Sequence, residues 1–232
     1  MEDYISLGKI KYRIVSNDYK GPCVLYVTGT FMENDIGAMY NAIQSKLEEK
    51  DFILCEVQVE DWDTYLTPWK ADGAMKGRCF EGKAREILGD IQDKLLPLLI
   101  TTYVNIIDFY IAGYSLAGLF SLWSLYESDI FAGAACCSGS LWYPGWDEYA
   151  RSHSLKRRQR VYLSLGNKEE KSRHPLMRLV GDRMREQYKL LKEDNLCSDV
   201  TLVWNEGGHF NNTVNRTAYG MEYLVSSNHG NA

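Results

Sequence analysis

The chain has 232 residues, 45% hydrophobic and 25% charged, and its formal net charge is -5. This composition is typical of a globular protein and excludes a disordered chain, a collagen-like repeat and a coiled coil. The acidic excess argues against nucleic acid as a partner, because neutralising phosphates requires a basic surface. No apolar run reaches the roughly 18 residues of a membrane-spanning helix, and the first residues lack the pattern of a secretory signal. We therefore expect a single domain over residues 1–232, with a flexible tail at about 226–232, in the cytoplasm.

The sequence contains no motif for a metal or nucleotide cofactor. Its six cysteines show no CxxC spacing and are too few for a disulfide framework. Neither an HExxH motif nor a histidine-rich tract is present. Gly113 and Gly118 have the spacing of a phosphate-binding loop, but Leu119 and Phe120 stand where such a loop needs Lys-Ser/Thr. We expect no cofactor and no bound metal.

Short apolar runs alternate with longer amphipathic segments along the chain. Residues 4–7 and 10–15 lie close together around Gly8 and predict an antiparallel hairpin. Apolar residues at spacings of three and four predict helices from Phe80 to Leu95 and from Leu176 to Leu191. Because most of the apolar runs are continuous, they predict buried strands of a parallel sheet, at residues 24–27, 52–59, 106–112, 131–137, 161–165 and 200–204. The alternation of strands and helices predicts an α/β fold.

One strand-to-helix junction carries the pattern of a nucleophile. Ser115 lies where the apolar run 106–112 gives way to an apolar helical segment. In a GxSxG nucleophile elbow the serine adopts a strained backbone, and the residues two positions away on either side must be small. Gly113 satisfies the first of these positions, and Ala117 stands at the second, where glycine is usual. The junction predicts Ser115 as a nucleophile.

A serine nucleophile requires a base, and the base requires an orienting acid. His209 follows the last predicted strand in a glycine-rich loop, so it should reach the same sheet edge as the serine. Glu169 and Glu170 come shortly after the preceding strand, and we choose Glu169 with Glu170 as the alternative. The order serine, acid, histidine is that of the α/β-hydrolases.

Backbone amides should stabilise the oxyanion that forms when the serine attacks a carbonyl. One donor is expected to be the N–H of Leu116, directly after the nucleophile. The second should come from the turn after the strand at residues 24–27. We choose the N–H of Thr30, with Phe31 as the alternative.

Two further segments carry a family resemblance. Residues 62–69, WDTYLTPW, resemble a DLTPWP loop of siderophore esterases, and residues 138–143, SGSLWY, resemble their SPSLWW segment. From about Val24 to its end, the chain resembles the esterase D-like branch of the α/β-hydrolases, which includes siderophore esterases, feruloyl esterases and S-formylglutathione hydrolase. The resemblance implies an eight-stranded, mostly parallel sheet with helices on both faces, and cofactor-free hydrolysis of an ester or thioester. Segments between the strands are too short for a large lid.

Aromatic residues are frequent in the segments that follow the predicted strands. Ligands of open α/β sheets bind at the carboxyl ends of the strands, and an aromatic rim there suits an apolar acyl group or an aryl ester. About half of these residues could instead cover helices, since aromatic side chains also dominate cores. We assign substrate contacts to four of them: Phe31, Tyr65, Trp69 and Trp142.

The leading hypothesis is a serine esterase that acts on a small-molecule ester, with no nucleic acid and no membrane as a partner. An acyltransferase would use the same three residues, because both reactions pass through an acyl-enzyme. A non-catalytic binding module on the same fold is the third hypothesis. The sequence leaves the oligomeric state open, a homodimer included.

Overall fold

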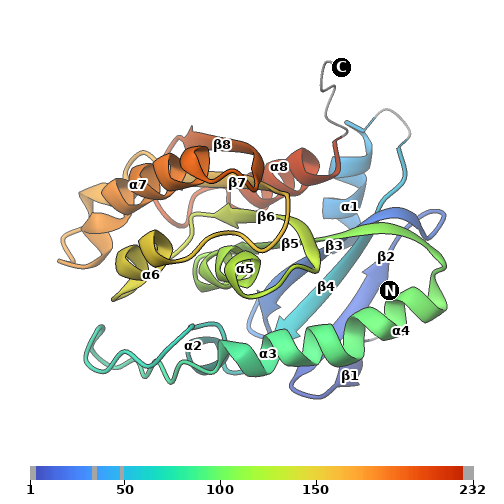
Figure 1. Cartoon of the computed structure of the whole chain (residues 1–232), viewed down its shortest axis with the longest axis horizontal. Helices are drawn as coiled ribbons and strands as arrows, with labels where there is room; N and C mark the ends of the chain where they lie inside the picture. Colours follow the sequence, from blue (N-terminus) through green and yellow to red (C-terminus); the bar gives the residue numbers. More distant parts are fainter. Residues whose placement is uncertain (1–3, 33–35, 48–49, 227–232) are drawn as a thin grey trace.

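Eight strands form one sheet in the computed structural model, which describes residues 4–32, 36–47 and 50–226 (Figure 1). The strands are β1 (Ile5–Leu7), β2 (Ile10–Val15), β3 (Lys20–Gly29), β4 (Ile53–Val59), β5 (Asn105–Tyr114), β6 (Phe131–Cys137), β7 (Gln159–Gly166) and β8 (Cys197–Asn205). Their order in the sheet is β1-β2-β4-β3-β5-β6-β7-β8. β1 and β2 pair antiparallel, β2 pairs antiparallel with β4, and all other neighbours are parallel. The predicted hairpin and the mostly parallel sheet are confirmed.

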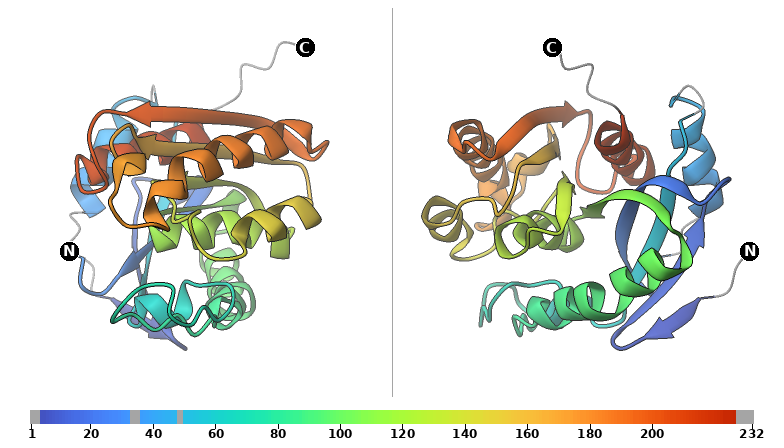
Figure 2. Two further views of the ribbon diagram at one scale, coloured as in Figure 1. Left: turned by 90° about the vertical axis from the view of Figure 1, so that its left-hand side faces the viewer. Right: turned by 45° about the vertical axis from the view of Figure 1, so that its right-hand side comes forward.

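Helices cover both faces of the sheet (Figures 1 and 2). One apolar cluster joins the sheet to α1 (Ile36–Gln44) and α8 (Thr213–Val225). A second cluster on the opposite face includes α3 (Ala84–Asp90), α4 (Leu96–Thr102), α5 (Leu116–Glu127), α6 (Trp146–Ser152) and α7 (Val180–Glu193). The short elements are α2 (Trp62–Tyr65), the π-helix η1 (Ile91–Leu95) and the 3₁₀ turns η2 (Glu169–Lys171) and η3 (Met177–Leu179).

The central strands are buried on both sides, as their continuous apolar runs predict. Every residue of β4 and of β7 is buried. The helices differ from the prediction at their ends. Phe80 is buried in the loop before α3, and the helical segment continues through η1 to the end of α4. Leu176 precedes η3, and the regular helix α7 begins only at Val180.

The register of the parallel strands brings four strand ends to one edge. Tyr114 at the end of β5 pairs with Cys137 at the end of β6, and Cys137 pairs with Ser164 near the end of β7. Gly166 at the end of β7 pairs with Asn205 at the end of β8. The residues that follow these strands are therefore neighbours in space although they are far apart in the sequence.

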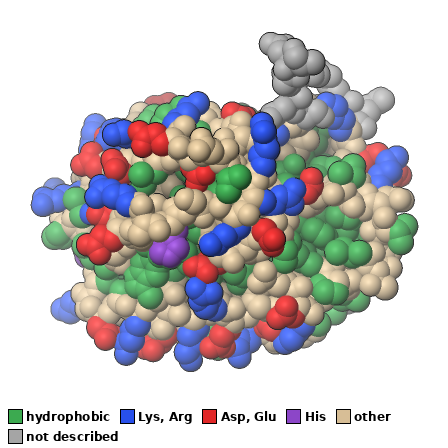
Figure 3. All heavy atoms as spheres, viewed as in Figure 1, with side chains coloured by type: hydrophobic (Ala, Val, Ile, Leu, Met, Phe, Trp, Pro, Cys, Tyr) green, Lys and Arg blue, Asp and Glu red, His purple; other side chains and the backbone are tan. Residues whose placement is uncertain are grey.

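The distribution of charged side chains on the surface and the burial of the cysteines are those of a globular protein. Basic and acidic side chains are interspersed over the face drawn in Figure 3. Four of the six free cysteines are buried: Cys23, Cys55, Cys136 and Cys137. Within the described residues, no helix is long and apolar enough to span a membrane. Of the predicted flexible tail, residues 227–232 lie outside the described part of the chain.

Candidate active site

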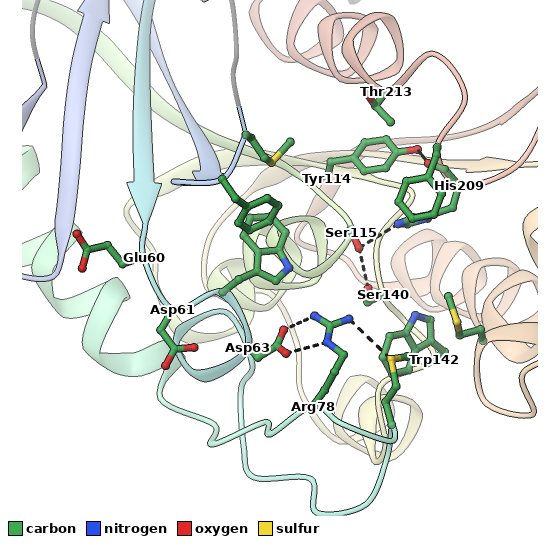
Figure 4. A pocket seen from close by; sticks show the side chains of 16 residues that line it. Glu60, Asp61, Asp63, Arg78, Tyr114, Ser115, Ser140, Trp142, His209 and Thr213 are labelled. Carbon is green, nitrogen blue, oxygen red and sulfur yellow. Dashed lines mark hydrogen bonds and ion pairs between the residues drawn. The ribbon is translucent and has the colours of Figure 1, made fainter.

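The structure brings Ser115, His209 and Glu169 into one hydrogen-bonded chain at this edge of the sheet. Ser115 lies in the turn between β5 and α5, Glu169 opens η2 after β7, and His209 lies in the loop after β8. The Ser115 Oγ is 3.1 Å from the His209 Nε2, and the His209 Nδ1 is 2.7 Å from the Glu169 Oε2. Figure 4 shows the hydroxyl of Ser115 turned toward the ring of His209.

The alternative acid, Glu170, lies outside this chain of contacts. Its carboxylate forms an ion pair with Arg185 at 2.9 Å, on the exposed side of η2. Of the two candidates, the structure therefore brings only Glu169 to the histidine.

The carboxylate of Glu169 divides its partners between its two oxygens. Oε2 accepts from His209, while Oε1 accepts from the amide of Gly166 at 2.7 Å and from the hydroxyl of Ser138 at 2.7 Å. Burial raises the pKa of this carboxyl, but the hydrogen bonds from His209, Ser138 and Gly166 and the attraction of His209 outweigh it and leave the pKa below its usual range. The carboxylate is thus held in its charged form, facing the imidazole.

The backbone around Ser115 has the strained shape of a nucleophile elbow. Its φ is 60° and its ψ is -120°, a region that L-residues rarely occupy. The turn is held by the Ser115 amide, which donates to the Cys137 carbonyl at 3.1 Å, and by the Ser140 amide, which donates to the Ser115 carbonyl at 3.0 Å. Alanine is tolerated at position 117 because Gly113, whose absent Cβ would come 2.7 Å from the Ala117 Cβ, leaves the space open.

The two expected oxyanion donors have different outcomes. Leu116 is the first residue of α5, where N–H groups have no intrahelical partner, so its amide suits the role. Thr30 does not suit the role, because its amide already donates to the Val59 carbonyl at 3.3 Å. The alternative donor is the amide of Phe31, which has no hydrogen-bond partner among the described residues.

A cavity of about 940 Å³ opens over Ser115 and His209 (Figure 4). Its walls come from the turn after β3, the segment after β4, the loop after β6 and the loop around His209. The walls are largely apolar, with aromatic rings and methionines: Phe31, Met32, Trp62, Met75, Trp142, Met177 and Phe210. Such a lining suits an apolar or aromatic portion of a substrate.

Two of the four predicted substrate contacts line the cavity and two do not. Phe31 and Trp142 are in the wall, as expected. Tyr65 packs against the core beneath the ammonium of Lys9. Trp69 donates from its indole Nε1 to the Pro144 carbonyl at 2.7 Å and is held there as a structural side chain. Neither ring lies in the cavity wall, because both pack against the core of the protein instead.

The sequence profile of the Putative esterase family matches residues 8–198 of the chain. The chain belongs to this family. The membership makes the protein a carboxylic ester hydrolase, and it confirms the resemblance that the motifs indicate.

The alignments with similar proteins cover nearly the whole chain of this esterase. YbbA of Bacillus subtilis (strain 168) is 25% identical over 226 residues, which cover 92% of this chain and 89% of YbbA. The siderophore hydrolase EstB from Aspergillus nidulans has a TM-score of 0.74 at 15% identity, covering 97% of this chain and 94% of its own. An IroE-like serine hydrolase from Shewanella oneidensis has a TM-score of 0.78 at 15% identity, covering 96% and 80%. These structures show the shared α/β-hydrolase fold, and the described residues of this chain include no large lid.

Arg216 of the esterase is a site residue that the sequence does not reveal. It projects from α8 and its side chain is 2% exposed. Its Nη1 donates to the Glu169 Oε1 at 3.1 Å and to the Tyr114 hydroxyl at 3.1 Å, and its Nη2 donates to the Glu206 carbonyl at 2.8 Å. The Tyr114 hydroxyl in turn donates to the His209 carbonyl at 2.6 Å. One guanidinium thus connects the acid to both ends of the segment that carries the histidine.

Ser140 is a second such residue. Its Oγ lies 3.4 Å from the Ser115 Oγ, and it is buried in the loop after β6. The resemblance of the SGSLWY segment drew attention to this loop. Nothing in the sequence indicates, however, that Ser140 lies next to the nucleophile.

Proposed function

We propose that the protein is a serine esterase that hydrolyses a carboxylic ester through Ser115, His209 and Glu169. The observation that carries the proposal is the continuous chain of contacts from the Ser115 Oγ through both ring nitrogens of His209 to a buried carboxylate. This is the arrangement that activates an otherwise inert hydroxyl.

The reaction would proceed in two halves. The Ser115 oxygen attacks the ester carbonyl while the His209 Nε2 takes its proton, and the amides of Leu116 and Phe31 donate to the new oxyanion. Collapse of the tetrahedral intermediate breaks the bond to the alcohol, which leaves with the proton from His209. Water then gives its proton to His209, attacks the acyl-enzyme and releases the acid, and the proton returns to Ser115.

The shape and lining of the cavity support a substrate of modest size. The aromatic and methionine side chains around Ser115 favour a flat or apolar portion next to the reacting carbonyl. Among similar structures are siderophore hydrolases from Aspergillus nidulans and Est1E from Butyrivibrio proteoclasticus with ferulic acid bound. We therefore propose aryl or lactone esters as the first classes to test, with thioesters as a second.

Steady-state and pre-steady-state hydrolysis of p-nitrophenyl acetate and butyrate tests this proposal. We expect a burst of p-nitrophenol equal to the enzyme concentration, and turnover that Ser115→Ala abolishes. Glu169→Gln should lower kcat by about a thousandfold, because the amide no longer holds the imidazole in its working tautomer. The matched control Glu170→Gln should keep full activity, since Glu170 faces Arg185.

Three results would contradict the proposal. Turnover in Ser115→Ala would show that Ser115 is not the nucleophile. Equal losses of kcat in the two glutamate variants would show that Glu169 is not the acid. If added alcohols captured all of the acyl group and no free acid formed, the protein would be an acyltransferase.

A further inference from the structure

A single cation lines the cavity within the described residues, and it is already paired. The guanidinium of Arg78 donates from its Nε to the Asp63 Oδ2 at 2.7 Å and from its Nη2 to the Asp63 Oδ1 (Figure 4). Its remaining nitrogen, Nη1, donates to the thioether of Met75 at 3.8 Å. The planar group also lies over the ring of Phe80, 5.2 Å from its centroid. Each of the three nitrogens therefore has one partner, and Asp63 accepts from two of the five N–H groups.

The pair is set into the wall of the cavity. The side chain of Arg78 is 34% exposed and that of Asp63 is 24% exposed. A bidentate contact between a guanidinium and a carboxylate is shorter and stronger than a contact between single atoms. Because Asp63 offsets the charge of Arg78, an incoming anion meets an ion pair there rather than an uncompensated cation.

The other charged groups of the cavity are acidic. Glu60 and Asp61 line it beside Asp63. Glu60 pairs with Lys11 at 2.7 Å, and Asp61 accepts from the Thr64 amide at 3.1 Å to cap α2. Arg78 offsets Asp63 and Lys11 offsets the exposed Glu60, whereas Asp61 has no ion-pair partner among the described residues. The wall therefore keeps a net negative charge, which repels an anionic substrate.

We propose that Asp63, by occupying Arg78, makes this site selective for esters that carry no negative charge on the portion held in the cavity. This inference rests on the proposed esterase function and names the substrate class of the same site. The apolar rings then bind the uncharged portion, and the acidic wall excludes carboxylate-bearing analogues.

The test compares matched esters that differ by one negative charge. The first pair carries it on the acyl part: p-nitrophenyl hexanoate and mono-p-nitrophenyl adipate. The second pair carries it on the alcohol part: 4-(methoxycarbonyl)phenyl butyrate and 4-carboxyphenyl butyrate. After subtraction of spontaneous hydrolysis, the wild-type enzyme should have a kcat/KM about tenfold or more higher for the neutral member of at least one pair. High salt should narrow that ratio.

The variant Asp63→Asn releases the charge of Arg78. Asparagine keeps the shape of the side chain and one acceptor oxygen, so the preference for the neutral ester should fall by about tenfold. The double variant Asp63→Asn/Arg78→Gln should restore the preference. The control Glu60→Gln removes one negative charge from the same wall without touching Arg78, and it should change the ratio by less than about twofold.

The outcomes separate this inference from the esterase function itself. Hydrolysis of both pairs with no preference, or with a preference for the anions, would overturn the selectivity while leaving the esterase in place. An unchanged ratio in a folded Asp63→Asn would overturn the role of Asp63. Absence of hydrolysis of all four esters by the wild-type protein would overturn the proposed function and this inference with it.

Discussion

Ser115 combines two demands that conflict, because the nucleophile needs a side chain where the backbone suits glycine. Its φ of 60° and ψ of -120° would be relaxed by removing the Cβ. The neighbouring contacts to Cys137 and Ser140 hold the residue in this conformation. Strain of this kind costs roughly 1–3 kcal/mol and occurs where function requires it.

Two inactive variants measure that strain. Ser115→Ala keeps the Cβ and the strain, whereas Ser115→Gly removes both. The glycine variant should be more stable by about 1 kcal/mol, since the relief of strain exceeds the entropic cost of glycine. Chemical denaturation of the two proteins gives the difference directly. A glycine variant less stable than the alanine variant would show that the turn is not strained.

Arg216 acts on the acid from within the protein, and this contact has a pH signature. The pKa of Glu169 lies below its usual range, so the carboxylate contributes stability above its unfolded-state pKa. That contribution is lost as the pH falls through the lowered native pKa. The hydrogen bonds from His209, Ser138 and Gly166 and the attraction of His209 lower this pKa. Because the Arg216 Nη1 also lies 3.1 Å from Oε1, removing the guanidinium should raise the pKa, so that less stability depends on the ionised form.

We expect Arg216→Met to lose about 3 kcal/mol of unfolding free energy at neutral pH, as is typical when one partner of a buried ion pair is removed. The deficit relative to wild type should shrink as the pH falls into the acid range where Glu169 becomes protonated. Urea denaturation at several pH values measures it. The surface control Arg185→Met should cost less than about 1 kcal/mol at every pH. A deficit of constant size for Arg216→Met would show that the residue acts through packing alone.

At the scale of elements, the contact between β5 and α5 depends on two small residues. A Cβ at Gly113 would come 2.4 Å from the carbonyl carbon and oxygen of Ala117. Gly113→Ala should therefore destabilise the protein by about 3 kcal/mol, because the start of the helix must move. Ala117→Gly should cost at most about 1 kcal/mol. Thermal and chemical unfolding compare the two.

The double variant Gly113→Ala/Ala117→Gly provides a further check. It should recover only part of the loss, since the close atoms of residue 117 belong to the backbone. A Gly113→Ala protein as stable as the wild type would contradict this account of the elbow.

The sequence predicts the strands well because each central strand is buried on both faces and is apolar throughout. Because residues that follow parallel strands meet at one edge of the sheet, the predicted strands also place Ser115, Glu169 and His209 near one another. The loops are less predictable, as α2 illustrates. Trp62 and Tyr65 both pack against the core, but only Trp62 also lines the cavity, and no periodicity in four residues distinguishes them.

Two other site features are invisible in the sequence for a different reason. Thr30 and Phe31 are adjacent in the sequence. Phe31 is left as the oxyanion donor only because the amide of Thr30 bonds to the carbonyl of Val59, which a sequence pattern does not reveal. Arg216 reaches Glu169 from α8 across 47 positions, and an arginine in an amphipathic helix is usually a surface residue. Such contacts depend on three-dimensional packing rather than on a local pattern.

At the scale of the whole molecule, the two-sided core should protect the thiols. Cys79 is exposed, Cys197 is partly buried with its pKa raised by burial to about 11, and the other four are buried. The hydrogen bond to Glu81 raises the pKa of Cys79 as well, so its exposure rather than its ionisation sets it apart. One thiol should therefore react first with Ellman's reagent in the native protein, a second more slowly, and all six after unfolding. Cys79→Ser should remove the fast phase. Several fast thiols in the wild type would contradict the packing of this core.

The alignment of four strand ends is the global feature that assembles the site. β5, β6, β7 and β8 end side by side and deliver Ser115, Ser138, Glu169 and the segment of His209 to one edge. The cavity above this edge is completed by the segments after β3 and β4. We expect this assembly to activate Ser115.

Labelling with a fluorophosphonate measures the activation of Ser115. The intact protein should gain the mass of one adduct, peptide mapping should locate it at Ser115, and Ser115→Ala should gain none. His209→Asn should label far more slowly while keeping the native fold, because the base is gone. A wild-type protein that gains no adduct, or an adduct that persists in Ser115→Ala, would contradict the account.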